Sequence, residues 1–404
     1  MAAPQLTPLE AAIDHLLAMA GEVMATETVN LTESLHRVLA EDQLVPADVP
    51  PADNSSVDGY AVRVEDVRPG QPLPVSDRIP AGQAPRQLAP GSAVRIFTGS
   101  EIPPGANAVV MQERVDISDD GITIHADVSE GQNIRRRGQD LSKGSHALLK
   151  GTLIRPQEMG LLASIGLAQV PVKRKLNVAI LTTGDELVDP GTPLAPGQIY
   201  NTNRYTLLGL LEQAGCAVTL CESLADDRAT TADTLLRAAG QADLIITSGG
   251  VSVGEEDHVR AVLEQSSTLS LWRLAIKPGK PLAFGHVDNT PVLGLPGNPA
   301  SVLVTFLMVA MPFIRKCQGR PGLEPAGEAL PAEFSVHETS VRREFVRVRR
   351  VHRSNQCWLE TYPNQSSGML SSACWADGLA VVPENTRVSP GDLLTYYSFN
   401  ELLA

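Results

Sequence analysis

The segment NVAILTTGDEL, residues 177–187, decides the fold class of the chain. It joins an apolar run that predicts a buried strand over 177–181 to a glycine-rich loop over 182–187. The same alternation of apolar runs and helical patterns continues to residue 314 and predicts a mostly parallel sheet with helices on both faces. Further strands are predicted over 217–220, 244–247, 271–276, 281–284 and 292–295, and helices over 205–214, 230–239, 259–263 and 300–314.

The chain changes character on both sides of this block. Residues 46–104 contain eleven prolines, which regular helices do not tolerate, and the short apolar runs between them predict strands. Apolar spacing predicts helices over 6–25, 31–39 and 156–165, whereas the segment after the Gly/Pro-rich linker 319–331 is β-rich. We therefore expect a multidomain α/β and β protein of four units: an elongated helical and extended unit (1–50 and 141–176), an inserted β domain (51–140), an α/β domain (177–322) and a C-terminal β domain (323–404).

Composition excludes several classes of partner. The 404 residues include 33 Lys and Arg against 46 Asp and Glu, a formal net charge of −13, so the chain lacks the positive field that nucleic acid or anionic membranes attract. The five cysteines show no CxxC spacing, which favours a reduced, cytoplasmic location over a disulfide framework or a zinc site. The apolar stretch 300–314 is shorter than the roughly 20 residues of a membrane span and predicts a buried helix that starts at Asn298-Pro299.

Three glycine-rich loops follow three predicted strands. They are TTGDEL (182–187), SGGVSVGEED (248–257) and PGNP (296–299). Because ligands of open parallel sheets bind beyond the carboxyl ends of the strands, we expect the loops to converge on one anion-binding crevice. Glycine and aspartate also form ordinary turns, which is the alternative for any single loop. The candidate ligand-binding residues of the loops are Thr183, Gly184, Gly249, Gly250, Ser252, Pro296, Gly297 and Asn298.

Charged residues add to this crevice. The acids of the first two loops, with Glu186 and Asp257 among them, are oxygen ligands of the kind that Mg²⁺ takes beside phosphates. Lys277 and Lys280 surround a tight turn at a strand end, where they suit an oxyanion, although an exposed turn is the more usual explanation for lysines taken alone. Asp227 follows a strand and is either a metal ligand or a helix cap, the commoner role.

The ordered motifs resemble a known family, the molybdopterin molybdotransferases, a MoeA-type family shared by the E domain of gephyrin. The resemblance is carried by SSVDGYA (55–61), FTG (97–99), IRRRGQD (134–140), LTTGDEL (181–187), TSGGVSVGEEDH (247–258), KPGKP (277–281) and GLPGNPAS (294–301). It is specific up to about residue 320 and weaker beyond the linker.

The resemblance implies an activity in molybdenum cofactor biosynthesis. The family inserts molybdate into adenylylated molybdopterin, cleaves the adenylate with the help of Mg²⁺ and releases AMP. It acts as a homodimer whose site joins the α/β domain of one subunit to the inserted domain of the other. Carried over by motif, the catalytic residues are Asp58, Asp140, Glu186, Asp227 and Asp257, the metal ligands are Glu186, Asp227 and Asp257, and further anion contacts are Thr98, Lys277, Lys280, Arg350 and Ser371.

Two other functions remain open at this point. The first is a binding or scaffold protein that keeps the fold without turnover, on the model of gephyrin, and that contacts other proteins. The second is adenylylation of molybdopterin, the preceding step, by the α/β domain. Tungstate is also an alternative to molybdate as the substrate, since both are tetrahedral oxyanions. Contacts with other proteins of molybdenum cofactor biosynthesis are expected as well.

Overall fold

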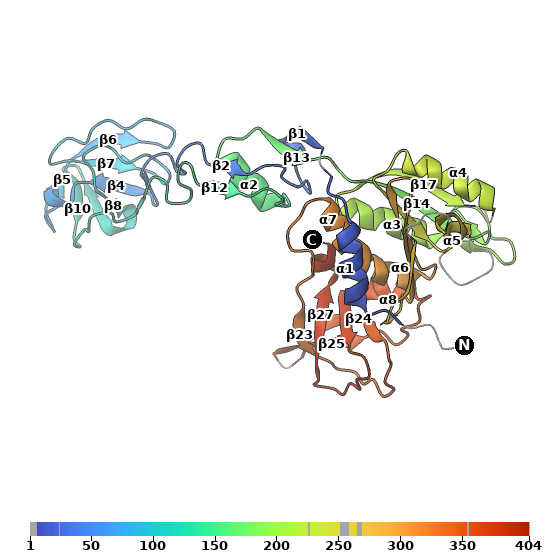
Figure 1. Cartoon of the computed structure of the whole chain (residues 1–404). Helices are drawn as coiled ribbons and strands as arrows, with labels where there is room; N and C mark the ends of the chain where they lie inside the picture. The colour runs from blue at the N-terminus through green and yellow to red at the C-terminus, as the bar shows by residue number, and fades with distance from the viewer. Residues whose placement is uncertain are drawn as a thin grey trace.

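A computed structural model describes residues 6–23, 25–224, 227–250, 258–264, 269–353 and 355–403. The molecule is elongated (Figure 1): a small β unit lies at one end, a narrow connector follows, and a larger body holds the α/β sheet and the C-terminal strands. The candidate residues therefore divide between two regions that lie far apart in one chain.

A six-stranded sheet forms the centre of the body, in the order β17-β14-β18-β22-β21-β19. Strands β17, β14, β18 and β22 are parallel, and β21 and β19 are antiparallel to their neighbours within the sheet. The predicted parallel α/β sheet is confirmed. Its strands are β14 (Asn177–Thr183), β17 (Ala217–Leu224), β18 (Leu244–Ser248), β19 (Ser270–Arg273), β21 (Pro281–Val287) and β22 (Thr290–Leu295).

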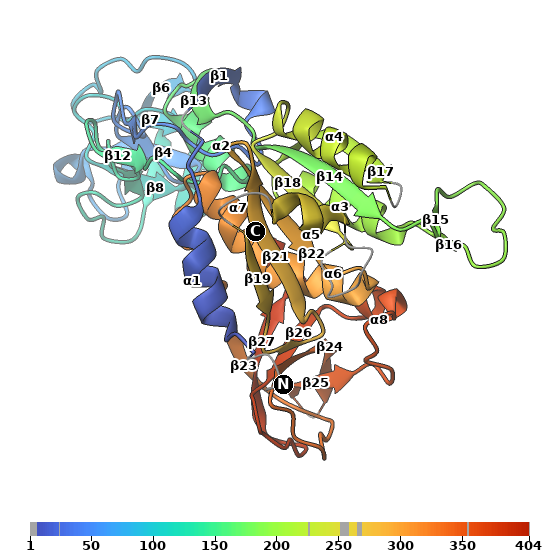
Figure 2. The same ribbon diagram turned by 45° about the vertical axis from the view of Figure 1, so that its right-hand side comes forward.

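Helices cover both faces of this sheet because alternate strand residues point to opposite sides. Val178 and Ile180 of β14 pack into one core, with α3 (Thr202–Gln213), and Ala179 and Leu181 pack into the other, with α4 (Arg228–Ala239) and α5 (His258–Leu263). The apolar runs along β14, β18 and β22 are thus explained by burial on both sides. A short pair of strands, β15 (Leu187–Val188) and β16 (Ile199–Tyr200), projects from the edge (Figure 2).

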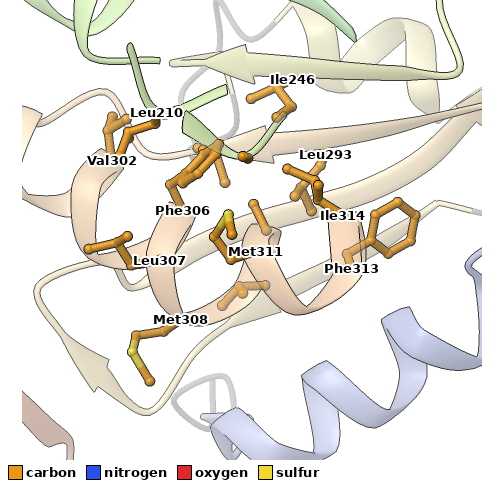
Figure 3. Close-up of a cluster of buried hydrophobic side chains, with 14 of the residues drawn as sticks. Leu210, Ile246, Leu293, Val302, Phe306, Leu307, Met308, Met311, Phe313 and Ile314 are labelled. Atoms are coloured by element: carbon orange, nitrogen blue, oxygen red, sulfur yellow. The ribbon is translucent and has the colours of Figure 1, made fainter. Parts of the chain in front are cut away.

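The apolar segment predicted as a buried helix is the centre of the first core. Helix α6 (Pro299–Thr305), a π-helical turn over Phe306–Ala310 and α7 (Met311–Cys317) run on as one helical rod. The rod is long and apolar enough by composition to cross a membrane, but 89% of its apolar window is buried inside the protein. Its side chains interlock with those of the sheet and α3 (Figure 3). The predicted start at Asn298-Pro299 is confirmed.

The N-terminal segment differs from its prediction. Helix α1 (Leu9–Met19) forms, but its buried side chains join the core of the six-stranded sheet and contact α7. The predicted helix over 31–39 is wrong: only a 3-10 turn over Leu31–Glu33 is present. His36 takes a φ of 60°, which a helix does not allow, and the chain continues in extended form. We propose to group α1 with the α/β unit.

The connector and the inserted unit are built from short strands. The connector holds helix α2 (Pro156–Ser164), near its predicted place, which packs with the 3-10 turn. In the inserted unit the main sheet has the order β6-β7-β4-β8. The connector strands are β1 (Thr26–Asn30), β2 (Gln43–Leu44), β12 (His146–Leu148) and β13 (Gln169–Lys173); the inserted strands are β3 (Asn54–Ser55), β4 (Gly59–Val62), β5 (Pro72–Leu73), β6 (Val75–Ile79), β7 (Ala93–Ile96), β8 (Ala108–Met111), β9 (Val115–Ser118), β10 (Gly121–Ile124) and β11 (Ile134–Arg135).

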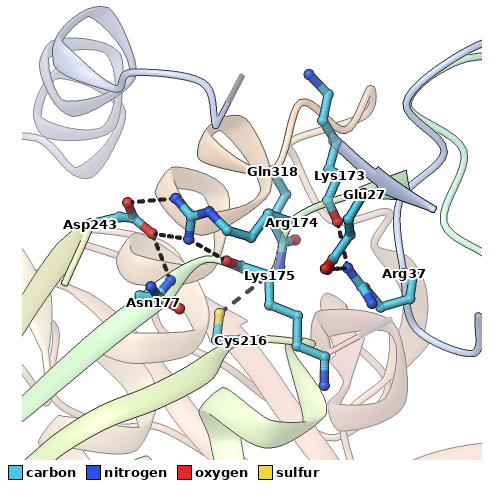
Figure 4. Close-up of polar contacts among 9 residues, drawn as sticks. All are labelled: Glu27, Arg37, Lys173, Arg174, Lys175, Asn177, Cys216, Asp243 and Gln318. Carbon is cyan, nitrogen blue, oxygen red and sulfur yellow. Dashed lines mark hydrogen bonds and ion pairs between the residues drawn. The ribbon is translucent and has the colours of Figure 1, made fainter. Parts of the chain in front are cut away.

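Charged side chains fix the joint between the connector and the body (Figure 4). The Arg174 guanidinium donates two hydrogen bonds to the carboxylate of Asp243, at 2.8 and 2.9 Å. The same carboxylate accepts the backbone N–H of Asn177 at 2.7 Å, where β14 begins. Buried Arg37 pairs with Glu27 and donates to the carbonyl oxygen of Lys173 at 2.8 Å. The connector is thus attached to the first strand of the large sheet.

The C-terminal region forms a sheet in the order β20-β24-β26-β27-β23, with β25 beside β24. Its β character agrees with the prediction, but two short helices, α8 (Leu370–Trp375) and α9 (Phe399–Leu403), were not predicted. Strand β20 belongs to the α/β segment of the chain, so the two regions share backbone pairing. The strands are β20 (Ile276–Lys277), β23 (Glu328–Pro331), β24 (Arg343–Arg353), β25 (Gln356–Thr361), β26 (Gly378–Val382) and β27 (Leu393–Ser398).

Candidate functional site

A cavity of about 640 Å³ lies beyond the carboxyl ends of β14, β18 and β22. All three predicted loops reach this region because the strands are parallel and adjacent. We call this space the cavity. Its predicted lining residues are Thr183, Glu186, Lys277, Lys280, Pro296, Gly297 and Asn298.

Glycines let the loops approach one another closely. Gly249 has a φ of 89°, and a Cβ added there would lie 2.6 Å from the Thr183 hydroxyl oxygen. Its backbone N–H donates to the Leu295 carbonyl oxygen at 3.1 Å, so the second loop is attached to the strand that precedes the third. Gly250 has a φ of 66° and Gly184 one of 137°, which side-chain-bearing residues rarely adopt. The glycines shape the cavity even where they do not line it.

The segment Asn201–Asn203 lines the cavity and was missed from the sequence. The Asn203 side-chain N–H group donates to the Ser248 hydroxyl at 2.9 Å and to the Gly297 carbonyl oxygen at 2.6 Å, which holds the second and third loops together. Asn201 caps α3 and donates to the Thr182 hydroxyl at 2.7 Å. An Asn-Thr-Asn pattern at a predicted helix start was the available signal.

Cations gather on one wall of the cavity. Lys277 is paired with Glu344 at 3.0 Å, whereas the side-chain ammonium of Lys280 has no hydrogen-bond or ion-pair partner in the described ranges. Burial, together with the charges of Arg273 and Arg342, lowers the pKa of Lys280. Arg342 itself lines the cavity. An incoming anion would stabilise this cluster of like charges, in which the Lys280 ammonium has no partner among the described residues.

The C-terminal sheet supplies the opposite wall, through Gln365, Ser366 and Ser367. The Ser367 carbonyl oxygen accepts the Ala300 backbone N–H at 2.9 Å, so this loop is attached to the start of α6. Arg347, 1% exposed, donates to the Ser366 carbonyl oxygen and the Ser372 hydroxyl, both at 3.0 Å. Burial lowers the pKa of Arg347 to about 10. Sequence reasoning missed these residues.

The two predicted C-terminal contacts, Arg350 and Ser371, do not line the cavity as described. Arg350 lies eight residues beyond Arg342, stacks on Tyr396 and pairs with Asp377 at 3.3 Å. We therefore replace these two residues by Arg342 and Ser367 as candidate anion contacts.

The predicted metal ligands are only partly brought together. Glu186 lines the cavity, but Asp227 caps α4 and its carboxylate accepts the Thr230 backbone N–H at 2.8 Å and hydroxyl at 2.7 Å. These two hydrogen bonds lower the pKa of Asp227. Asp257 and Ser252 lie outside the described residues. Within the described ranges, no group of three or more Asp, Glu, His or Cys side chains is arranged to hold a metal ion.

The inserted unit carries the remaining candidates, far from the cavity of the same chain (Figure 1). The Asp58 carboxylate accepts the Thr98 backbone N–H and hydroxyl, both at 2.8 Å, and these bonds lower the pKa of Asp58. Asp140 follows the turn of IRRRGQD, and its backbone N–H donates to the Val49 carbonyl oxygen at 3.0 Å. One chain does not bring Asp58, Thr98 or Asp140 to Glu186.

The comparisons with known proteins agree along the whole chain. Residues 7–166 match the MoeA N-terminal region (domain I and II), residues 179–316 a probable molybdopterin binding domain and residues 329–399 the MoeA C-terminal region (domain IV). The chain belongs to the MoeA family. This MoeA-family chain combines the three regions in that order.

Individual MoeA relatives match over nearly their full length. The molybdopterin molybdenumtransferase of Haemophilus influenzae is 42% identical over 383 residues, 94% of this chain and 95% of that protein. Molybdopterin molybdenumtransferase 2 of Mycobacterium tuberculosis is 38% identical over 89% of this chain and 91% of its own. The crystal structure of a molybdopterin biosynthesis MoeA protein from Pyrococcus horikoshii OT3 superposes with a TM-score of 0.82 at 32% identity, covering 98% of this chain and all (100%) of that one.

Proposed function

We propose that the chain is a molybdopterin molybdenumtransferase that inserts molybdate into adenylylated molybdopterin, cleaves the adenylate and releases AMP. The observation that carries the proposal is the cavity, in which three glycine-rich loops meet an unpaired lysine and an arginine. Such a space suits a substrate with several negative charges. Membership of the MoeA family and the names of its relatives support the same reaction class.

The cation wall fits a tetrahedral oxyanion. Lys280 supplies an ammonium without a carboxylate partner, Arg342 supplies a planar donor fork, and Ser367 supplies a hydroxyl from the opposite wall. Lys277 is held by Glu344 and contributes less free charge. We assign molybdate to this wall, and the phosphates of the organic substrate to the glycine-rich loops, whose backbone N–H groups are suited to anions.

The cavity suits a Mg²⁺ ion that is held largely by substrate phosphates better than one whose ligands all come from the protein. Mg²⁺ commonly takes one or two carboxylates, with substrate phosphates and water completing its ligands. Among the described residues, Glu186 is the carboxylate that lines the cavity, and Thr183 lines it as well. When bound, the ion would neutralise phosphate charge. Asp227, whose carboxylate is engaged by Thr230, is a weaker candidate ligand.

A homodimer would complete the site. Asp58 and Thr98 adjoin β4 and β7 of the inserted unit, which lies at the far end of the molecule from the body that holds the cavity (Figure 1), so a second copy must bring them to the cavity if they act there. The hydrogen bonds from Thr98 keep the Asp58 carboxylate ionised and fixed in direction. A positioned carboxylate of this kind orients water or accepts a proton.

The decisive experiment follows AMP release by the purified full-length protein from adenylylated molybdopterin. Release should require both molybdate and Mg²⁺, and EDTA should abolish it. Glu186→Gln should lose most of the rate, whereas the exposed Glu212→Gln on α3 is the matched control and should keep it. Unchanged release by Glu186→Gln would refute the assignment of the cavity. Consumption of ATP with plain molybdopterin would instead establish the adenylylation step.

A further inference from the structure

The inserted unit carries a row of cationic and aromatic side chains beside Asp58. Arg78 on β6 and Tyr60 on β4 are the register partners of Arg95 on β7, the strand between them. Directly paired residues of adjacent strands share one face of a sheet. Phe97 follows Arg95 by two residues and therefore points to the same side. Four side chains from three strands thus form one row, which we name the arginine row: Arg78, Arg95, Phe97 and Tyr60.

The arginine row holds two guanidinium groups against one aromatic ring. The Cζ atom of Arg78 lies 4.6 Å from the Phe97 ring centroid, and that of Arg95 lies 4.8 Å from it. Arg95 also lies 5.1 Å from the Tyr60 ring centroid. Stacking on aromatic faces fixes the planes of both guanidinium groups and leaves their N–H edges directed along the surface.

Neither guanidinium is neutralised by an ion pair with a carboxylate in the described part of the chain. Arg95 donates to the Gly59 carbonyl oxygen at 3.1 Å and to the Gln112 side-chain oxygen at 2.5 Å, both uncharged, while the exposed Arg78 side chain makes no hydrogen bond to any described residue. Arg136 and Arg137 of this unit are paired, with Asp53 at 2.7 Å and with Asp48 at 2.6 Å, whereas Arg86, like Arg78 and Arg95, has no ion pair among the described residues. What distinguishes Arg78 and Arg95 is that their two guanidinium groups lie against the same aromatic ring, in a chain with a net charge of −13.

The arginine row also adjoins a candidate catalytic group. Thr98, which binds the Asp58 carboxylate, directly follows Phe97 in the chain. The charge of Arg95 contributes to the lowered pKa of Asp58, after the two bonds from Thr98. A ligand that reaches Asp58 therefore meets this positive surface.

We propose that the arginine row is an anion subsite that binds the phosphoanhydride of the adenylylated substrate from the side of the inserted unit. This inference rests on the proposed function, because it assumes that the region around Asp58 and Thr98, called the Asp58 corner from here on, meets the cavity of a second copy. Two guanidinium forks held against one ring can each bind one of the two phosphates, and the half-buried Phe97 ring holds both forks in place. Arg78 and Arg95 are then binding residues, and Phe97 is a positioning residue.

The test is calorimetric titration of the full-length protein with ADP, a probe that contains a phosphoanhydride and adenine but is not turned over. Wild type should bind ADP, and Arg78→Ala should weaken binding about tenfold or more, the size expected for loss of a charge-assisted contact. Arg95→Lys keeps the charge and loses the fork, and should also weaken binding. Arg86→Ala, an exposed arginine of the same unit, is the matched control and should bind as wild type does.

The outcomes are separable from those of the AMP-release assay. Equal ADP affinity in wild type, Arg78→Ala and Arg95→Lys would overturn the inference, as would failure of wild type to bind ADP. Thermal unfolding checks that each variant is folded, and Arg78→Ala is the safer variant because its side chain makes no hydrogen bond. Absence of AMP release in wild type would refute the proposed function, whatever the titration shows. Affinity for ADP in wild type should also fall with added salt more steeply than in Arg78→Ala.

Discussion

The cavity and the Asp58 corner differ in how their charges are partnered. In the cavity, Lys280 has no partner in the described ranges and Glu186 faces open space. At the corner, the Asp58 carboxylate accepts two hydrogen bonds from Thr98. A cation without a partner is stabilised by a ligand that brings negative charge. A carboxylate that already accepts two hydrogen bonds is instead fixed in its orientation before a ligand arrives. The comparison indicates that the cavity of the body binds anions through free charges and that the inserted unit directs the reaction through Asp58, in addition to the anion contacts proposed for the arginine row, if the two regions meet.

The largest expected effect is on the rate of AMP release, and it tests whether the cavity of one copy meets the Asp58 corner of another. Asp58→Asn and Glu186→Gln should each lower AMP release by about 10²–10⁴-fold, as loss of a positioned proton-transfer or charge-bearing group does. A mixture of the two variants, unfolded and refolded together, should regain about a quarter of the wild-type rate, because in random two-fold dimers half are mixed and each of these has one intact site. No recovery, with mixed dimers verified by differently tagged chains, would break the comparison between binding and directing regions.

The next effect separates two neighbouring lysines of the cavity. Lys280→Met should raise the KM for molybdate by about tenfold or more, because it removes an unpaired charge from the cation wall. Lys277→Met should have a smaller effect, since Glu344 already engages that ammonium at 3.0 Å. Steady-state kinetics at varied molybdate measure both. Equal effects would mean that pairing in the free protein does not predict which lysine holds the anion.

A third effect compares glycines of the two regions. Gly249→Ala should lower the free energy of unfolding by about 2–3 kcal/mol, because a positive φ and a close approach to Thr183 both oppose a Cβ. Gly99→Ala beside Thr98 has a positive φ of 81° but no atom within 4 Å of the added Cβ, so about 1 kcal/mol is expected. Urea unfolding compares the two. A larger loss for Gly99 would contradict the role of close packing at the cavity.

The smallest expected effect is a change in the pKa of the Asp58 carboxyl group. Thr98→Val removes the hydroxyl bond to Asp58 and keeps the backbone one, so the pKa of Asp58 should rise toward its ordinary value of 3.8 without reaching it. A lowered pKa in the folded state stabilises the protein above the ordinary pKa, and this contribution is lost as the pH falls through the lowered value. Carbon-13 NMR titration of the carboxyl group measures the shift. An unchanged pKa in Thr98→Val would show that the hydroxyl is not a significant partner.

Prediction from sequence succeeded where one local pattern determines the outcome. Apolar runs followed by glycine-rich loops gave the parallel sheet and the edge at which Thr183 and Asn298 meet, because parallel strands end on the same side. The buried rod was predictable from its length and its Asn-Pro start. The short helix over 31–39 was not, since His36 leaves the helical region and the residues after it, Val38 and Leu39, form bridges to Leu153 and Val172, which are distant in the sequence.

The walls of the cavity depended on tertiary pairing. Six arginines lie between residues 342 and 353, and strand periodicity alone does not say which of them reaches the ligand. The parallel pairing of Ile276 with Arg343 decides it, because it brings the neighbouring Arg342 to the cavity, where its guanidinium donates to the Ile276 carbonyl oxygen at 3.5 Å, and leaves Arg350 near Asp377. Asn203 was missed because its hydrogen bonds join loops that are distant in sequence.

The shared backbone pairing of β20 with β24 has a mechanical consequence. Lys277 stands on β20, which comes from the α/β segment of the chain and pairs with β24 of the C-terminal sheet, and the Ser367 carbonyl oxygen accepts the Ala300 backbone N–H at the start of α6. The two walls of the cavity are therefore coupled as stiffly as neighbouring strands, with little freedom to widen. A receptacle of fixed width selects the groups that enter it by size as well as by charge, which favours tetrahedral groups such as molybdate and the phosphates of the proposed substrate over bulkier anionic groups.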